Sequence, residues 1–159
     1  LDMIDLNCRA LVHITQLTLP YLEKGAHVIQ IDSLSAFQPV PYLGVYGATK
    51  AFVLSYSRSL NAELAPRGIH MMAFCPGWVK TEFFDHAEQT SKTAVTYFNQ
   101  LFTAREVVAC ALRDSARGRD VCVPGFRIKL QVLLTKLLPH RLVMRIWLKQ
   151  QKHAGKTEA

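Results

Sequence analysis

Residues 27–50 read HVIQIDSLSAFQPVPYLGVYGATK, and the expected fold class follows from this stretch. Its apolar run, residues 28–31, is short and predicts a buried parallel strand. Prolines and a glycine in residues 39–44 indicate a loop. From residue 45 to about 65 the apolar side chains recur every three or four positions, which predicts a long helix. A strand, a loop and a helix in this order are typical of an α/β protein.

The segments on either side continue the alternation of helices and strands. We expect a helix over residues 2–20, strands over 69–74 and 120–123, and a helix over 104–116. Residues 78–102 show no clean period, so we expect irregular structure with short helical pieces. Strands that alternate with helices predict a parallel sheet with right-handed crossovers. Three strands alone would leave a sheet edge and part of the first helix uncovered, so we also expect self-association.

Basic residues are concentrated at the carboxyl end of the chain. The net charge is +7, and residues 127–159 hold eight Lys or Arg against Glu158 alone. Pro139 divides this region into two amphipathic helices. Such helices can lie at a membrane surface, but packing on the chain's own core or on a second copy would use the same apolar face. Because the excess charge belongs to this region alone, we expect no nucleic-acid partner.

The expected organisation has three parts. They are an α/β unit over residues 1–125, a basic amphipathic helical extension over 126–150 and a flexible tail over 151–159. No run approaches roughly 20 apolar residues, so we expect no spanning helix. We expect a cytoplasmic protein, with peripheral membrane contact through residues 127–150 as the open alternative.

The cysteines and histidines show no metal-binding pattern. The sequence contains no CxxC pair and no HExxH motif, and the cysteines have apolar neighbours. The four cysteines are Cys8, Cys75, Cys110 and Cys122. We therefore expect buried, reduced thiols and no metal site.

Three polar residues of the 27–50 stretch can share one site. Ser33 follows the expected strand at its carboxyl end, the edge at which open α/β sheets bind ligands. Tyr46 and Lys50 lie four positions apart on the following helix and therefore share a face. A nearby ammonium group favours phenolate and lowers a tyrosine pKa from about 10, so Tyr46 could act as a general acid or base. With the Ser33 hydroxyl holding a substrate oxygen, this group suits carbonyl reduction or alcohol oxidation.

The order of these residues resembles the pattern of the short-chain dehydrogenase/reductase family. The matching residues are Asn7 in the first helix, Ser33, YGATK at 46–50 and PGWVKT at 76–81. In the family, an Asn, a Ser, a YxxxK motif and a PG turn that leads to a Thr follow in this order. The resemblance covers about residues 1–125. It implies a Rossmann-like, doubly wound parallel α/β sheet, of which this chain would hold the second half.

The resemblance implies a role for each matched residue. Tyr46 would be the catalytic acid or base, and Lys50 would lower the Tyr46 pKa and hold the nicotinamide ribose hydroxyls of NAD or NADP. Ser33 would orient the substrate, and Asn7 would hold a water molecule of the proton relay. The further cofactor contacts implied are Pro76, Gly77, Val79 and Thr81. Hydride transfer would be the chemistry of the cofactor.

In the family, a segment that corresponds to residues 78–102 closes over the substrate. The aromatic side chains of this segment suggest that the substrate is a hydrophobic carbonyl or alcohol, unless they pack on the sheet. They are Trp78, Phe83, Phe84, Tyr97 and Phe98. A homo-oligomer is also expected.

The family's pattern is not matched ahead of Asn7. The TGxxxGxG turn, the residue that selects NAD or NADP and the NNAG strand are not found in the 159 residues, so no helix N-terminus is provided for the pyrophosphate. We therefore expect a fragment of an NAD(P)-dependent oxidoreductase. The alternative is an inactive truncated enzyme that acts through dimerisation or membrane contact.

Overall fold

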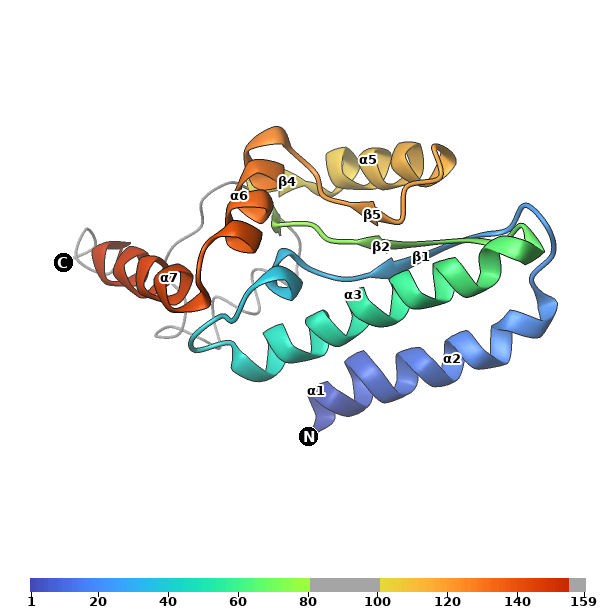
Figure 1. Cartoon of the computed structure of the whole chain (residues 1–159), viewed down its shortest axis with the longest axis horizontal. Helices are drawn as coiled ribbons and strands as arrows, with labels where there is room; N and C mark the ends of the chain where they lie inside the picture. The colour runs from blue at the N-terminus through green and yellow to red at the C-terminus, as the bar shows by residue number, and fades with distance from the viewer. Residues whose placement is uncertain (81–100, 155–159) are drawn as a thin grey trace.

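The computed structural model describes residues 1–80 and 101–154, with side chains described as far as Gln151. Its centre is a parallel sheet in the order β1-β2-β5. The strands are β1 (His27–Ile31), β2 (His70–Phe74) and β5 (Val121–Cys122). Helices cover both faces of this sheet, as Figure 1 shows. The three parallel strands expected from the sequence are therefore present.

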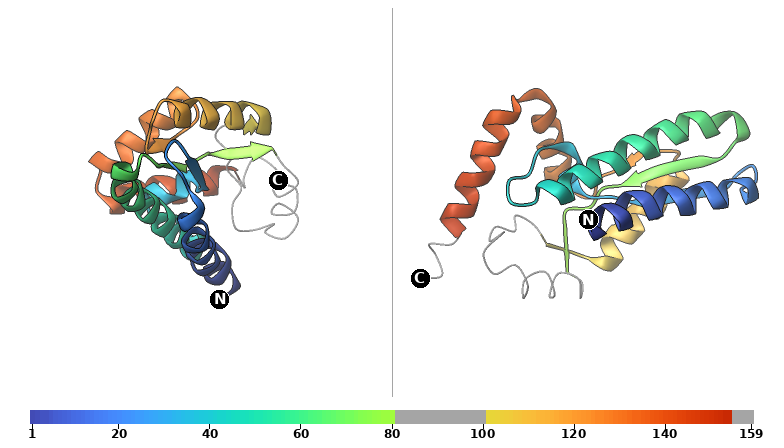
Figure 2. Two further views of the ribbon diagram at one scale, coloured as in Figure 1. Left: turned by 90° about the vertical axis from the view of Figure 1, so that its right-hand side faces the viewer. Right: turned by 90° about the horizontal axis from the view of Figure 1, so that it is seen from below.

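The helices agree closely with the periodicity of the sequence. They are α3 (Gly44–Leu64), α5 (Ala104–Ala116), α6 (Phe126–Leu137) and α7 (His140–Ala154). The first helical segment is continuous but changes its winding, with α1 (Asp2–Ile4), a π-helical stretch (Asp5–Ala10), α2 (Leu11–Thr18) and a 3₁₀ turn (Leu19–Tyr21). It runs alongside α3 in both Figure 1 and Figure 2. Figure 1 also places α3 and α5 on opposite sides of the sheet.

The core lies on both faces of β2, because the side chains of a strand alternate between its faces. Met72 and Phe74 pack with α5, and Met71 packs with the carboxyl-terminal part of α3. Ala73 packs with α6 on the same side as Met71. This double burial explains why residues 69–74 form an almost unbroken apolar run.

Two short strands correct the expectation for residues 78–102. β3 (Trp78–Lys80) and β4 (Leu101–Thr103) form a second, two-stranded parallel sheet where irregular structure was expected. Val79 and Phe102 are paired in it and pack against the apolar cluster between β2 and α5. Three-residue strands are too short to show an alternating pattern in the sequence, which is why they escaped prediction.

The carboxyl-terminal helix extends past the boundary expected at residue 150. α7 continues to Ala154, and Gln151 is buried. The Trp147 indole N–H donates a hydrogen bond to the Pro41 carbonyl, 3.1 Å away, and so attaches α7 to the loop before α3. Within the residues described, no helix combines the length and the apolar character needed to cross a bilayer.

Candidate active site

The candidate site begins where β1 and β2 end. Two backbone hydrogen bonds join the segments that leave these strands: the Asp32 N–H donates to the Phe74 carbonyl at 2.8 Å, and the Leu34 N–H donates to the Pro76 carbonyl at 2.9 Å. Ser33 lies between these two bonds and is held at the carboxyl edge of the sheet. This is the edge at which open α/β sheets bind ligands.

Ser33 is oriented by the short helix that it begins. Its hydroxyl oxygen accepts a hydrogen bond from the Ser35 N–H at 3.2 Å and so caps the 3₁₀ turn Leu34–Phe37. The same hydroxyl group interacts with the phenol of Tyr46. The serine that the sequence predicts for the site therefore lies close enough to the predicted tyrosine for its hydroxyl group to lower the Tyr46 pKa.

Lys50 joins α3 to the end of β1. Its Nζ atom donates a hydrogen bond to the Ile31 carbonyl at 3.0 Å and lies 5.7 Å from the centre of the Tyr46 ring. An ammonium group has three N–H donors, so this bond leaves two for a ligand. Ser33, Tyr46 and Lys50 thus converge at one edge of the sheet, from one strand end and one helix face.

The pKa of Tyr46 is shifted in the direction opposite to the one expected from its spacing to Lys50. Burial raises it, the interaction with Ser33 lowers it and the charge of Asp32 raises it. Burial also lowers the pKa of Lys50, while the charge of Asp32 acts against that change. Burial disfavours the charged form of each group, so Tyr46 is held as a neutral phenol in this chain. A neutral phenol is a proton donor.

Asn7 contacts α3 at Thr49, in the turn that follows Tyr46. Its amide Nδ2 donates to Thr49 Oγ1 at 3.1 Å, and Thr49 Oγ1 donates to the Tyr46 carbonyl at 2.8 Å. Thr49 is buried, and sequence reasoning did not single it out. Asn7 lies in the π-helical stretch, a rare form that is frequent at functional sites. The described contacts link Asn7, through Thr49, to the backbone of α3 at Tyr46.

The turn after β2 provides the remaining predicted cofactor contacts. Pro76 is fixed by its bond to Leu34, and a Cβ atom added to Gly77 would meet no atom closer than 4.0 Å. Val79 lies in β3 next to Phe102, whereas Thr81 lies outside the described residues. The hydrogen-bonding groups of Lys50 and Tyr46 fit the hydroxyl groups at the ribose end of a nicotinamide dinucleotide.

Asp32 is a member of this group that sequence reasoning missed. It is only 3% exposed; its Oδ2 atom accepts a hydrogen bond from the Cys75 thiol at 3.4 Å, and its Oδ1 atom has no partner among the described residues. Burial raises its pKa to about 7, while the Cys75 thiol, the Ser33 backbone and the Lys50 charge lower it. An acid directly after an apolar strand was the available signal.

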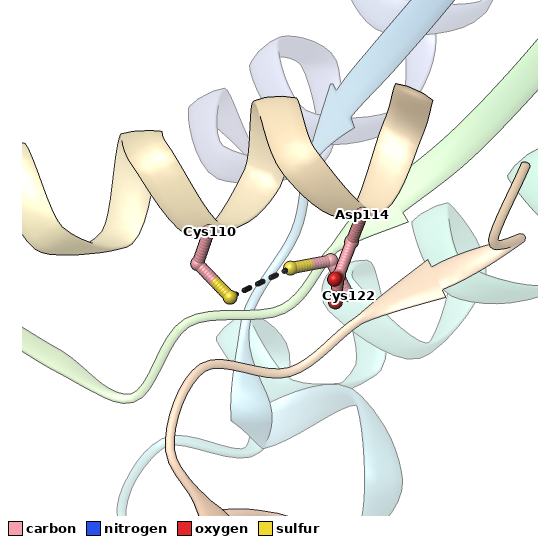
Figure 3. A group of neighbouring side chains, drawn as sticks. All are labelled: Cys110, Asp114 and Cys122. Atoms are coloured by element: carbon pink, nitrogen blue, oxygen red, sulfur yellow. Dashed lines mark hydrogen bonds between the residues drawn. The ribbon is translucent and has the colours of Figure 1, made fainter. Parts of the chain in front are cut away.

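A second cluster lies between α5 and β5, on the face of the sheet opposite α3. Figure 3 shows Cys110, Asp114 and Cys122 pointing toward one another. The two Sγ atoms are 3.7 Å apart, and one ligand atom from each residue lies within 4.8 Å of the others. However, Arg119 pairs with Asp114 at 3.2 Å, and burial raises the Cys122 pKa. A cation would need thiolates and a free carboxylate, so the arrangement suits thiol packing better than metal binding.

Comparisons with known proteins point to one family. The family model described as short chain dehydrogenase matches residues 1–92. An uncharacterized oxidoreductase of Staphylococcus epidermidis is 43% identical over 81 residues, which are 50% of this chain and 35% of that protein. The chain therefore matches only about a third of the length of this relative.

Solved structures of short-chain dehydrogenases and alcohol dehydrogenases resemble the fold of this chain. A short-chain dehydrogenase from Sphingobium yanoikuyae, in complex with NADPH, is 32% identical with a TM-score of 0.65, over 77% of this chain and 47% of that one. A bulky-bulky ketone specific alcohol dehydrogenase from Comamonas testosteroni is 29% identical with a TM-score of 0.60, over 77% and 45% of the two chains. Both support the Rossmann-like fold expected for the described sheet.

Proposed function

Because the chain belongs to the short-chain dehydrogenase family, we propose that it carries the catalytic residues of an NAD(P)-dependent oxidoreductase that interconverts a carbonyl and an alcohol. The observation that carries this proposal is the convergence of Ser33, Tyr46 and Lys50 at the carboxyl end of β1. Each of the three supplies a different function: a hydroxyl for the substrate oxygen, a phenol for the proton and a cation beside the phenol.

In the proposed reduction, Tyr46 donates a proton to the substrate oxygen. Burial keeps its hydroxyl protonated, which suits a general acid. The Ser33 hydroxyl, held by its capping bond, donates a hydrogen bond to the same oxygen as negative charge develops there. In the reverse direction, the Tyr46 phenolate accepts the alcohol proton, and the Lys50 ammonium stabilises that phenolate.

A nicotinamide cofactor supplies the hydride when it is bound. In our proposal, Lys50 and Tyr46 hold its ribose hydroxyls, and the turn at Pro76 and Gly77 accommodates its nicotinamide end together with Val79. The NADPH complex of the Sphingobium yanoikuyae relative supports a nicotinamide cofactor for this chain. Thr81, which the resemblance also assigns to the cofactor, lies outside the described residues.

We propose a hydrophobic carbonyl or alcohol as the substrate class. Trp78 follows the turn at Gly77 directly and is partly exposed. The relative from Comamonas testosteroni is named for bulky ketones, which supports an apolar substrate for this chain. The other aromatic residues of the expected lid lie outside the described residues; they are Phe83, Phe84, Tyr97 and Phe98.

Calorimetric titration tests the cofactor assignment. The protein that carries residues 1–159 is titrated with NADPH and, separately, with NADH, and we expect micromolar binding of one of them, which is about 8 kcal/mol. Lys50→Met should weaken that binding at least tenfold, and Lys24→Met, a change of the same charge on the exposed surface, should leave it unaltered. If neither nucleotide binds, the proposed function is wrong.

A second candidate function, contact with an anionic membrane surface, is favoured by the surface of α6. Five large apolar side chains of this helix are exposed: Phe126, Leu130, Leu133, Leu134 and Leu137. They lie among basic residues, which is typical of helices that bind at a lipid interface. The protein should cosediment with vesicles that contain anionic lipid and not with neutral vesicles. Equal recovery with both would exclude this function.

We also propose that the protein forms a homo-oligomer. Phe52 and Tyr56 stack on α3 with ring centres 5.8 Å apart, and Phe52 is 41% exposed. Ile14 and Leu17 add exposed apolar surface on α2. Mass measurement in solution should give a multiple of the chain mass, and Phe52→Glu should reduce it. A monomeric wild-type protein would contradict this assignment.

A further inference from the structure

A buried acid lies behind the proposed catalytic pair and has no part in the mechanism above. Asp32 directly precedes Ser33, is 3% exposed and is held by a backbone bond to Phe74. One carboxyl oxygen accepts from the Cys75 thiol, and the other has no partner among the described residues. A buried carboxyl group with an unpaired oxygen costs stability, so its presence in the core requires an explanation.

The groups around Asp32 are those of the candidate site. From α3, Lys50 acts on it as a positive charge and Tyr46 as a titratable phenol. From the segment after β2, Cys75 faces it, and the pKa of this thiol is raised by burial and by Asp32. Lys50 is bonded to the carbonyl of Ile31, the residue that precedes Asp32. Asp32, Lys50 and Tyr46 therefore influence one another's protonation through their charges.

We propose that Asp32 is a positioning residue that acts through its charge: when ionised, it holds Lys50 as an ammonium ion and Tyr46 as a neutral phenol. A negative charge favours a nearby cation and disfavours a nearby phenolate. An ionised Asp32 therefore keeps Tyr46 protonated to a higher pH and extends the alkaline limit of the range in which Tyr46 can donate a proton to a carbonyl. This inference rests on the proposed function, because it assigns the pH dependence of reduction to a residue outside the reacting group.

The charge of Asp32 changes within the physiological pH range. Because its pKa is raised to about 7, the carboxyl group is mostly neutral below that pH and mostly ionised above it. Proton donation leaves a Tyr46 phenolate, which an ionised Asp32 disfavours, so the rate of reduction should fall as the pH rises through 7. An exposed aspartate, with a pKa near 4, would exert the same charge throughout this range and could not produce such a change.

The first test compares pH profiles of reduction and oxidation. The protein that carries residues 1–159 is assayed as wild type, as Asp32→Asn and as Asp120→Asn, a matched loss of one carboxylate at a half-exposed ion pair with Arg58. In Asp32→Asn, the ionisation near pH 7 should disappear, and the alkaline loss of reduction should move to lower pH by about one unit. Asp120→Asn should retain the wild-type profile.

Two outcomes of this test would contradict the proposal. If the profile of Asp32→Asn has the same shape as that of the wild type, the proposal is wrong. If kcat falls or KM rises by the same factor at every pH, Asp32 has only a structural role, and the proposal is equally wrong.

A second test does not depend on turnover. The carboxyl carbon of Asp32 is followed by NMR during a pH titration of the wild type and of Lys50→Met. We expect a titration near pH 7 in the wild type and a higher midpoint in Lys50→Met, because loss of the cation disfavours the carboxylate. A midpoint near 4, or the same midpoint in both proteins, would overturn the inference. If the protein shows no turnover, the proposed function fails, and this titration still decides the role of Asp32.

Discussion

Replacement of Asp32 by Asn should change how the stability of the fold depends on pH. The pKa of Asp32 is raised from 3.8 to about 7, chiefly by burial. Because the folded state binds this proton more tightly than the unfolded state does, the contribution of Asp32 to stability is greatest below pH 4. It falls as the pH rises toward 7 and is constant above that value. The difference in pKa corresponds to about 4 kcal/mol of unfolding free energy.

Urea unfolding at a series of pH values from 4 to 8 measures this effect. The free energy of unfolding of Asp32→Asn, relative to wild type, should increase by as much as about 4 kcal/mol between pH 4 and pH 8. The absolute cost of the Asn side chain cancels in this comparison, because only the change with pH is used. Asp120→Asn, at the half-exposed Arg58 ion pair, should show a far smaller change. A difference between Asp32→Asn and wild type that stays constant over this range would refute the reasoning.

Three further substitutions test the core, a helix cap and the site. Met72→Ala empties a fully buried position in β2 and should lower the unfolding free energy by about 2–5 kcal/mol in urea; a loss below 1 kcal/mol would contradict this core. Thr103→Ala removes the capping box of α5 and should cost about 1 kcal/mol in the same assay, whereas no change would argue against the cap. Ser33→Ala should lower kcat about 100-fold with an unchanged calorimetric Kd for the cofactor, and unaltered kcat would exclude Ser33 from the site.

The longer helices and strands were predictable from the sequence, because burial of one face produces a regular spacing of apolar residues. The apolar runs at β1 and β2 and the periodicity of α3 gave the correct element types to within a few residues. β3 and β4 were not predictable, since a three-residue strand contains too few positions to alternate. Their pairing depends on packing against the β2 and α5 cluster, which no local pattern records.

The sequence predicted which residues form the candidate site better than it predicted their pKa shifts. Spacing alone suggested that Tyr46 and Lys50 share a face and that Ser33 lies near them, and the structure brings the three together; their catalytic roles remain predictions. The direction of the Tyr46 pKa shift could not be obtained from spacing, because it depends on burial by distant segments. The burial of Asp32 was hidden for the same reason.

The turnover of Tyr46→Phe tests the central claim most directly. The protein that carries residues 1–159 is assayed with reduced nicotinamide cofactor and a hydrophobic ketone, beside Tyr56→Phe, which removes a phenol hydroxyl from the same helix ten residues away. We predict that Tyr46→Phe loses at least 100-fold in kcat, the usual contribution of a general acid, with little change in cofactor Kd, and that Tyr56→Phe turns over at the wild-type rate. Wild-type kcat in Tyr46→Phe would contradict the account.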